Sequence, residues 1–269
     1  MFGNAVAENK TKIFLSLGIA VMFALLCALL PRIAAPGEGP GVEEKGPRAY
    51  AYGVVKALGG GMELHYLRVQ PSNVLPEAVH GNVVSTPYYG INGGFFYQND
   101  LLSIAVVNDV PVNGQTGGYG AGGANVKYAR GTLVWDGAAN ALSVQVVRDA
   151  AEIRVTDRSR YWAQGGVSMS LGSDDRWAEQ AAHENAPFAD EARLRSAAVY
   201  DADGNLYLIV SATPGTLAEF RETVKTRIGG GRLVDGIFLD GDGSSQLRSR
   251  EAKLTGDGRP VVQMLRLLV

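Results

Sequence analysis

Apolar residues recur along most of this chain with the spacing of β-strands, and glycine-rich turns separate the runs. Apolar side chains that alternate with polar ones, or that form short continuous runs, are typical of strands buried on one or both faces. The pattern predicts strands at residues 50–57, 62–70, 83–91, 101–107, 110–112, 131–135, 142–147, 153–155, 161–171, 197–200, 206–210 and 237–239. Closing strands are predicted from Leu247 onward and at residues 260–269. Asp203-Gly204-Asn205 forms the turn of the clearest predicted hairpin.

One segment, residues 214–228, shows clear helical periodicity. Its apolar residues on one helical face are Leu217, Phe220, Val224 and Ile228. Thr216 and Glu219 form a capping-box pattern at its start. Residues 173–194 are charged and rich in alanine, which favours a partly helical insertion, either a lid over a binding site or a solvated helix. The predicted fold class is α+β, with a mixed, largely antiparallel sheet and few flanking helices in a single globular domain.

The N-terminal region carries an apolar segment. Residues 13–30 contain no charge, and Lys10 and Lys12 precede them, an arrangement that places the N-terminus in the cytoplasm. Roughly 17–25 apolar residues span a bilayer, so the length favours an uncleaved transmembrane anchor. A cleaved signal peptide is the alternative, with Ile33-Ala34-Ala35 as an imperfect cleavage site, and a buried soluble helix is a third reading.

This segment sets the expected domain organisation. Residues 1–12 are predicted to be cytoplasmic, residues 13–30 to lie in the membrane, and residues 31–47, rich in Gly, Pro and Glu, to be a linker. Residues 48–269 are then the folded domain, outside the cytoplasm. With signal cleavage, the same domain would be secreted or periplasmic.

Composition excludes several classes of function. The chain has 269 residues, with 25 basic and 27 acidic side chains and a net charge of −2, so no basic excess points to nucleic acid. The one cysteine, Cys27, lies in the apolar N-terminal segment. The predicted domain therefore has no internal disulfide, no cysteine nucleophile and no zinc–thiolate site.

The most informative polar motif follows the predicted strand that ends at Leu239. Asp240 closes that strand, and the turn after it contains Gly241, Asp242, Gly243, Ser244 and Ser245. A carboxylate at the end of a rigid strand is well placed for chemistry, and glycines let backbone N–H groups approach a ligand closely. The plainer interpretation is an ordinary Asp/Gly turn between two strands.

Three more motifs carry candidate ligand-binding side chains. Asn92 follows a predicted strand and precedes Gly93 and Gly94, and its amide can donate and accept at once. Gln164 offers a second amide, and the Arg195 guanidinium suits a phosphate because it can donate two parallel hydrogen bonds. Taken alone, each also fits a turn, a packing position or the surface.

Together these motifs resemble the phosphodiester glycosidase family, which includes the enzyme that uncovers mannose 6-phosphate by removing N-acetylglucosamine, and bacterial proteins linked to exopolysaccharides. The matching blocks stand in the family's order between about residues 88 and 248. They are Asn92-Gly93-Gly94-Phe95-Phe96, Gln164-Gly165-Gly166, Arg195-Ser196-Ala197 leading to Asp203-Gly204-Asn205-Leu206-Tyr207, and Leu239-Asp240-Gly241-Asp242-Gly243-Ser244-Ser245-Gln246. The family usually has glycine where this chain has Asp242.

The resemblance implies an exported or membrane-anchored glycosidase that hydrolyses the sugar–phosphate bond of sugar-1-phosphodiesters in an envelope or extracellular polysaccharide. Asp240 would be the catalytic carboxylate, and Arg195 would bind the phosphate. Asp242 would be either a second catalytic carboxylate or a charge that repels the phosphate. The implied substrate-binding residues are Asn92, Gly93, Gly94, Gln164, Arg195, Gly241, Gly243, Ser244 and Ser245. The four blocks should meet at one end of the sheet.

Other functions remain open or are disfavoured. A catalytically inactive module for carbohydrate binding or exopolysaccharide assembly is the alternative, and Asp242 is the feature that favours it. A serine hydrolase is disfavoured because the chain has no Gly-x-Ser-x-Gly motif. Asp240, Asp242 and Glu251 fit three positions of a calcium loop, but Ser245 replaces its required glycine. We expect no cofactor and no dedicated metal site, and leave a bound divalent cation open.

Overall fold

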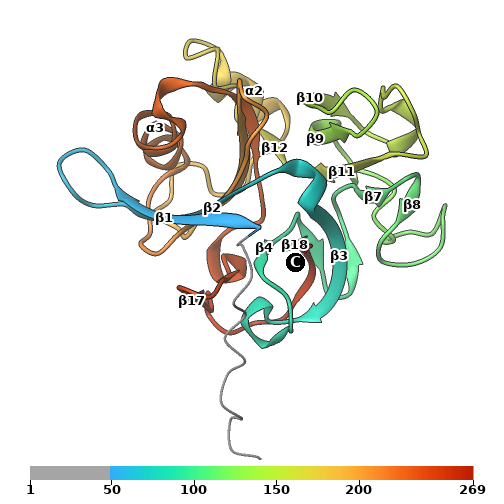
Figure 1. The fold of residues 1–269 in the computed structure, drawn as a ribbon, viewed down its shortest axis with the longest axis horizontal. Helices are drawn as coiled ribbons and strands as arrows, with labels where there is room; N and C mark the ends of the chain where they lie inside the picture. The colour runs from blue at the N-terminus through green and yellow to red at the C-terminus, as the bar shows by residue number, and fades with distance from the viewer. Residues whose placement is uncertain (1–48, 269) are drawn as a thin grey trace, which may run out of the picture. The chain divides into compact units, whose positions relative to one another are not determined.

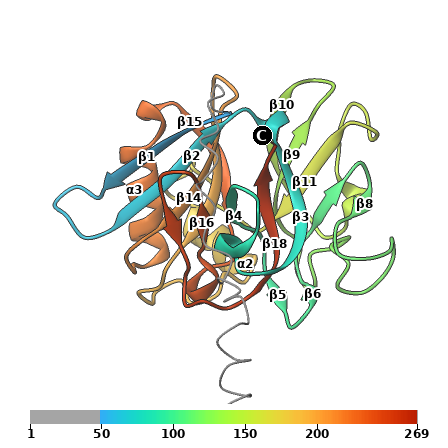
Figure 2. The same cartoon turned by 60° about the horizontal axis from the view of Figure 1, so that its bottom comes forward.

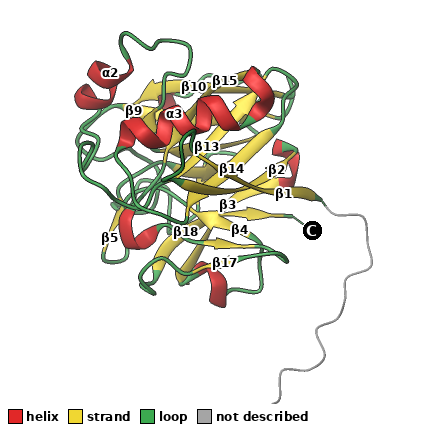
Figure 3. Cartoon of the chain, turned by 90° about the vertical axis from the view of Figure 1, so that its left-hand side faces the viewer, coloured by secondary structure: helices red, strands yellow, loops and turns green. Residues whose placement is uncertain are grey.

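The computed structural model describes residues 49–268, which form three larger sheets and one small hairpin. Every strand pair recorded among these residues is antiparallel. The predicted fold class, α+β with a largely antiparallel sheet and few helices in one globular domain, is confirmed (Figure 3). The segments predicted at residues 1–12, 13–30 and 31–47 lie outside the described residues. Within residues 49–268, no helix has the length and apolar character needed to cross a membrane.

The first sheet has six strands in the order β1-β2-β14-β13-β15-β12. Their bounds are β1 Tyr50–Lys56, β2 Glu63–Val69, β12 Val167–Ser168, β13 Ser196–Asp201, β14 Leu206–Ser211 and β15 Leu233–Phe238. The last of these strands, β15, delivers the chain to Asp240.

Two five-stranded sheets and a hairpin complete the domain. The second sheet, in the order β10-β9-β11-β7-β8, contains β7 Ala105–Val107, β8 Val110–Pro111, β9 Arg130–Asp136, β10 Ala141–Val147 and β11 Tyr161–Gly165. The third, in the order β17-β16-β4-β18-β3, contains β3 Val74–Gly81, β4 Gly90–Asn92, β16 Leu247–Arg248, β17 Lys253–Leu254 and β18 Val261–Leu267. The hairpin pairs β5 Phe96–Tyr97 with β6 Asp100–Leu101. Strands β3 and β18, from opposite ends of the domain sequence, run side by side (Figure 2).

Helices are few and short. The described α-helices are α2, Trp177–His183, and α3, Leu217–Arg227. The 3-10 turns are η1 Pro71–Asn73, η2 Val83–Ser85, η3 Ala150–Glu152, η4 Gly229–Gly231 and η5 Asp242–Ser244. The predicted capping box of Thr216 and Glu219 is present at the start of α3, and α3 lies against the outer face of the first sheet (Figure 1).

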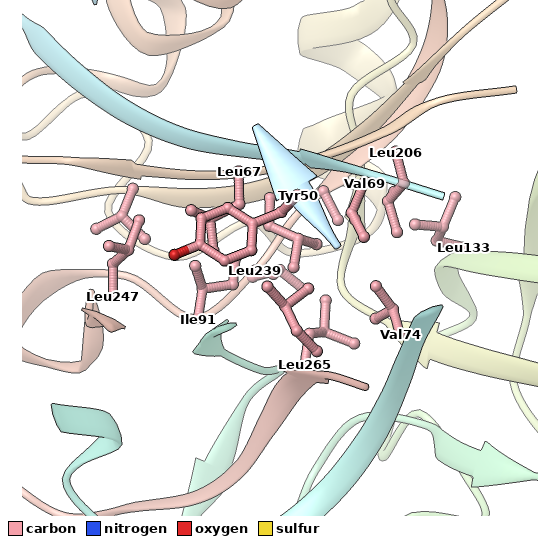
Figure 4. Close-up of a cluster of buried hydrophobic side chains, with 14 of the residues drawn as sticks. Tyr50, Leu67, Val69, Val74, Ile91, Leu133, Leu206, Leu239, Leu247 and Leu265 are labelled. Atoms are coloured by element: carbon pink, nitrogen blue, oxygen red, sulfur yellow. The ribbon is translucent and has the colours of Figure 1, made fainter. Parts of the chain in front are cut away.

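Alternation along the first sheet divides the core. Leu206 and Leu208 point to the central cluster, whereas Tyr207 and Ile209 point to the cluster beneath α3, which includes Phe220. Successive strand side chains face opposite sides, so one sheet supplies both cores. The central cluster lies where all three larger sheets meet (Figure 4), and its members include Leu67, Val69, Val74, Ile91, Leu133, Leu239 and Leu265.

Two predicted strands are wrong. Residues 83–91 were expected to be one strand, but Val83–Ser85 is the turn η2, which the Asn82 side chain caps, and pairing starts only at Gly90. The actual neighbouring strand, β3, includes Pro76, which lacks an N–H; it is tolerated there because β3 is an edge strand. The short strand expected at residues 153–155 is instead irregular chain after η3.

Candidate active site

Asp240 lies two residues beyond Phe238, the last residue of β15, where the first and third sheets meet. The Leu239 N–H donates to the Ser196 carbonyl at 2.9 Å, and the Asp240 N–H donates to the Gly93 carbonyl at 3.2 Å. The Asp240 carbonyl in turn accepts from Asn92 Nδ2 at 2.8 Å. Two segments far apart in the sequence, at residues 92–93 and at Ser196, therefore hold the backbone of Leu239 and Asp240 in place.

Asn92 is a positioning residue in this structure. Its Oδ1 accepts from Ser196 Oγ at 2.8 Å and from the Gln246 N–H at 3.0 Å, and its side chain is 1% exposed. Since both Nδ2 and Oδ1 of Asn92 are hydrogen-bonded within the protein, this side chain joins β4, β13 and the Asp240 turn. The predicted contact between Asn92 and substrate stays a prediction.

Gly93, Gly94 and Gln164 pack around Gln263 of β18. Gly94 N–H donates to Gln263 Oε1 at 3.2 Å, and Gln263 Nε2 donates to Gln164 Oε1 at 2.8 Å. A Cβ on Gly93 would lie 1.7 Å from Gln263 Oε1, and one on Gly94 would lie 2.7 Å from Gln164 Nε2. Glycine is needed here for close packing, and Gln164 is fully buried. Gln263 was not predicted, although a glutamine within the apolar run of β18 is a visible signal.

A cavity of about 300 Å³ opens beside Asp240. Its charged lining consists of four arginines and two aspartates, namely Arg130, Arg193, Arg195, Arg259, Asp240 and Asp242. Phe95, Val167 and Phe238 belong to its apolar wall. Of the predicted site residues, Asp240, Gly241, Asp242 and Arg195 line this cavity. Arg130, Arg193 and Arg259 were not predicted, since an arginine in a strand or loop carries no local signal of function.

The environment of Asp240 favours its neutral form. Burial raises the pKa of the Asp240 carboxyl to about 7, although hydrogen bonds from the Ser244 side chain and the Gly241 N–H and the charge of Arg259 oppose this rise. The Gly241 N–H lies 3.1 Å from Oδ1. The side chain remains partly accessible from the cavity. Near neutral pH the site therefore contains both the acid and the carboxylate.

Two buried arginines face the cavity with part of each guanidinium unused. Arg195, 6% exposed, donates from Nε to the Gly215 carbonyl and from Nη2 to the Phe188 and Glu191 carbonyls. Arg130, 7% exposed, donates from Nε and Nη2 to the carbonyls of residues 184 and 185. Within residues 49–268, no group accepts a hydrogen bond from Nη1 of either arginine.

Both arginines are cations, and no carboxylate within residues 49–268 forms a hydrogen bond with either guanidinium. Burial lowers the pKa of both guanidiniums from the ordinary value, and for Arg195 the nearby charge of Arg193 adds to that effect. Arginine still keeps its proton in proteins. A buried guanidinium that donates hydrogen bonds only to neutral carbonyls favours an anionic ligand, because the anion offsets the desolvation of the cation.

Asp242 adopts a backbone conformation that is more often found at glycine. Its φ is +54°, in the left-handed region that glycine occupies without steric cost. Its Oδ2 accepts from Arg193 Nη1 at 3.0 Å, and Arg193 also pairs with Glu191 and lies 4.7 Å from the centre of the Phe188 ring. The Asp242 carboxylate is thus paired with a cation at the cavity wall.

The other predicted residues of this turn lie behind the cavity. A Cβ on Gly243 would lie 2.1 Å from Asp257 Oδ2, so this glycine is needed for close packing. Ser244 is buried and hydrogen-bonds to Asp240. Ser245 Oγ is buried and has no hydrogen-bond partner within residues 49–268. In the same residues, no group of three or more His, Cys, Asp or Glu side chains is arranged to hold a metal ion.

Comparison with known proteins finds a structural likeness only. The catalytic domain of zebrafish N-acetylglucosamine-1-phosphodiester alpha-N-acetylglucosaminidase, auto-inhibited by its pro-peptide, is similar with a TM-score of 0.58 and 14% identity, over 84% of this chain and 85% of that chain. A hypothetical protein from Synechocystis gives a TM-score of 0.49 and 14% identity, over 82% of this chain and 62% of that chain.

No protein-family model matches the sequence. No curated protein matches it either. At 14% identity, the likeness to the zebrafish domain shows a shared fold and nothing about shared chemistry.

Proposed function

We propose that this protein is a hydrolase that releases a sugar from a sugar-1-phosphodiester. The observation that carries the proposal is one cavity that joins Asp240, a carboxyl with a pKa of about 7, to two buried guanidiniums, Arg130 and Arg195, with unused N–H groups. Catalysis of this reaction needs cations for the phosphate and a carboxylate beside the anomeric carbon.

The proposed mechanism assigns a step to each group. The guanidiniums of Arg130 and Arg195 bind the phosphodiester, whose oxygens are weak bases and leave with little help from an acid. As the bond from the anomeric carbon to oxygen breaks, its electron pair goes to the phosphate oxygen. The ionised Asp240 stabilises the positive charge on the sugar and accepts a proton from the attacking water. The products are the free sugar and a phosphomonoester.

The fold supports this choice of reaction. The zebrafish enzyme named above shares the fold, and its name specifies N-acetylglucosamine attached through a phosphodiester. N-acetylglucosamine-1-phosphodiesters are therefore the first substrates to test. We further propose that the natural substrate is a carbohydrate or sugar-phosphate polymer of the cell envelope or surroundings, reached by a domain that residues 13–30 anchor to the membrane.

The decisive assay follows sugar release by the purified full-length protein. Methyl phosphodiesters of N-acetylglucosamine, glucose and mannose would be compared with the matching sugar-1-phosphates and methyl glycosides. We expect release from a diester, with a loss of at least 100-fold in kcat for Asp240→Asn. Asp175→Asn is the matched control, since the Asp175 side chain is 82% exposed. Equal turnover by Asp240→Asn and the parent would refute the role of Asp240.

A second candidate function is a carbohydrate-binding module without catalysis. The pairing of Asp242 with Arg193 favours it, because a cation at the cavity wall already has a carboxylate partner and is less available to a phosphate. Binding of the diesters without sugar release would support this alternative. Asp242→Gly, which frees Arg193 and suits the positive φ, would then show whether Asp242 is what prevents turnover.

A further inference from the structure

A second cavity adjoins the candidate active site. It measures about 430 Å³ and is lined by Tyr97, Tyr119, Tyr128 and Lys127, among others; we name it the tyrosine groove. Its three tyrosines come from three separate stretches of the chain: the end of β5, the glycine-rich segment of residues 113–124, and the residues before β9. The volume lies within the usual range of roughly 300–1,000 Å³ for ligand pockets.

The tyrosine rings are open to solvent. Tyr119 is 73% exposed, Tyr97 is 65% exposed and Tyr128 is 38% exposed. Single exposed aromatic residues are common, but three around one groove form an apolar surface suited to a partner. A tyrosine presents a flat apolar face and a polar hydroxyl, which match the C–H face and the hydroxyl groups of a sugar ring.

The groove continues directly from the active-site cavity. Four residues line both, namely Phe96, Leu102, Arg130 and Asn185. The Arg130 guanidinium lies 4.9 Å from the centre of the Phe95 ring, on the active-site side, and 5.5 Å from the centre of the Tyr128 ring, in the groove. A molecule that extends out of the active-site cavity past Arg130 would therefore enter the tyrosine groove.

The charge of the groove selects among ligands. Lys127 and Arg130 line it, whereas no aspartate or glutamate among the described residues does. The active-site cavity, in contrast, contains both signs of charge. An aromatic surface with basic side chains and no acid suits a ligand that alternates sugar rings with negative charges.

We propose that the tyrosine groove binds the adjoining units of an anionic, phosphodiester-linked carbohydrate chain whose end sugar occupies the active-site cavity. This rests on the proposed function and specifies its substrate class as a polymer. Single-stranded nucleic acid offers similar chemistry, but a net charge of −2 for the chain gives no general attraction to it.

The test measures binding by the full-length Asp240→Asn protein, which removes turnover from the readout. Calorimetry would compare phosphodiester-linked hexamers of N-acetylglucosamine, glucose and mannose with the corresponding single-unit methyl diesters. A neutral N-acetylglucosamine hexamer and an oligothymidine hexamer are the other probes. The groove variants are Tyr97→Ala with Tyr119→Ala, and Lys127→Gln. Leu58→Ala is the surface control, since Leu58 is 71% exposed and lines neither cavity.

We expect at least one phosphodiester hexamer to bind tenfold or more tightly than its single unit. The double tyrosine variant should remove that advantage, Lys127→Gln should reduce it only for charged hexamers, and Leu58→Ala should leave it unchanged. Equal affinity for hexamers and single units, or tightest binding of oligothymidine or the neutral hexamer, would overturn the proposal. Failure of the proposed function would appear separately, as absence of sugar release from single-unit diesters by the parent protein.

Discussion

At the scale of single residues, Asp240 shows how burial creates a usable acid. Surrounding protein removes water from the carboxylate and raises its pKa to about 7, while Ser244, Gly241 and Arg259 keep the ionised form accessible. An ordinary aspartate has a pKa near 3.9 and would be fully ionised at neutral pH. Perturbed carboxyls in clefts are candidates for catalysis because either protonation state can form during turnover.

The first prediction concerns the pH dependence of the proposed reaction. Because ionised Asp240 is the active form, kcat/KM for a sugar-1-phosphodiester should rise about tenfold per pH unit below pH 7 and reach a plateau above it. The measurement is kcat/KM from pH 5 to 9 at constant ionic strength. A rate that falls as pH rises through 7 would assign Asp240 the role of general acid instead.

The second prediction links the same pKa to stability. Between pH 4 and 7 the folded state holds a proton on Asp240 that the unfolded state has lost, so this carboxyl makes folding less favourable as pH rises. This destabilisation of the folded state by Asp240 is complete above pH 7 and absent below about pH 4. Asp240→Asn should therefore be more stable than the parent by about 2 kcal/mol at pH 8, after allowance for solvent in the cavity, and no more stable at pH 4.

Urea unfolding at both pH values is the appropriate measurement. Asp175→Asn is the control, since that side chain is largely in water and should change stability little at either pH. A gain that is the same at pH 4 and pH 8 would show that charge burial is not its cause.

The predicted site residues differ in where the structure places them. Asp240 and Arg195 were predicted from motif resemblance, and both line the cavity. Asn92 and Gln164 were predicted as substrate-binding, yet their amides are hydrogen-bonded within the protein. A buried amide that holds a loop and one that contacts a sugar have the same sequence signature; burial and partners distinguish them.

At the scale of elements, local patterns predicted most strands and the helix α3. Asn108 and Asp109, at φ values of 51° and 67°, form the expected tight turn between β7 and β8. The strand wrongly predicted at residues 83–91 and the unpredicted strand β3 have separate causes. At residues 83–91, apolar content suggested a strand where Asn82 in fact caps a 3-10 turn. In β3, Pro76 argued against a strand, and the proline is tolerated only because β3 lies at the edge of its sheet.

The third prediction tests the contact between the turn after β4, at Gly94, and the end of β11. In Gly94→Ala, the added Cβ would lie 2.7 Å from Gln164 Nε2 and from the Gly165 carbonyl, so packing must shift. We expect a loss of about 1–3 kcal/mol in the free energy of unfolding. Turnover should also fall, because the neighbouring Gly93 carbonyl accepts from the Asp240 N–H.

Urea unfolding and the sugar-release assay together check this expectation. Gly172→Ala is the matched control, because a Cβ there meets nothing within 4 Å and its φ is not positive. That variant should retain full activity and equal or slightly greater stability. A Gly94→Ala protein as stable and active as Gly172→Ala would show that the close approach of Gly94 to β11 is not required.

At the scale of the whole domain, the site depends on pairings that local sequence does not specify. Strand β4 contacts β18 and β16, and β13 lies between β14 and β15, so residues near positions 92, 195 and 240 meet only after the first and third sheets come together. Periodicity predicts that strands exist, but not which strands pair. The convergence of the motifs was therefore expected from family resemblance alone, and the structure brings them together at Asp240.

The last prediction follows from this assembly. A ligand that bridges Arg195, Arg130 and the Asp240 turn contacts segments from separate sheets, so its binding must stabilise the domain against global unfolding. Inorganic phosphate at ten times its dissociation constant should add about 1.4 kcal/mol to the free energy of unfolding, which raises the melting temperature by about 3–6 °C for a domain of this size.

Two arginine variants test where the phosphate binds. Arg195→Lys keeps the positive charge but loses the forked geometry of the guanidinium, and its shift in melting temperature at the same phosphate concentration should be at most half as large. Arg227→Lys, an exposed change on α3, should shift like the parent. Calorimetry with sodium chloride at matched ionic strength separates binding from screening; equal shifts in all three proteins, or an equal shift in chloride, would place the phosphate elsewhere than the cavity that Arg195 lines.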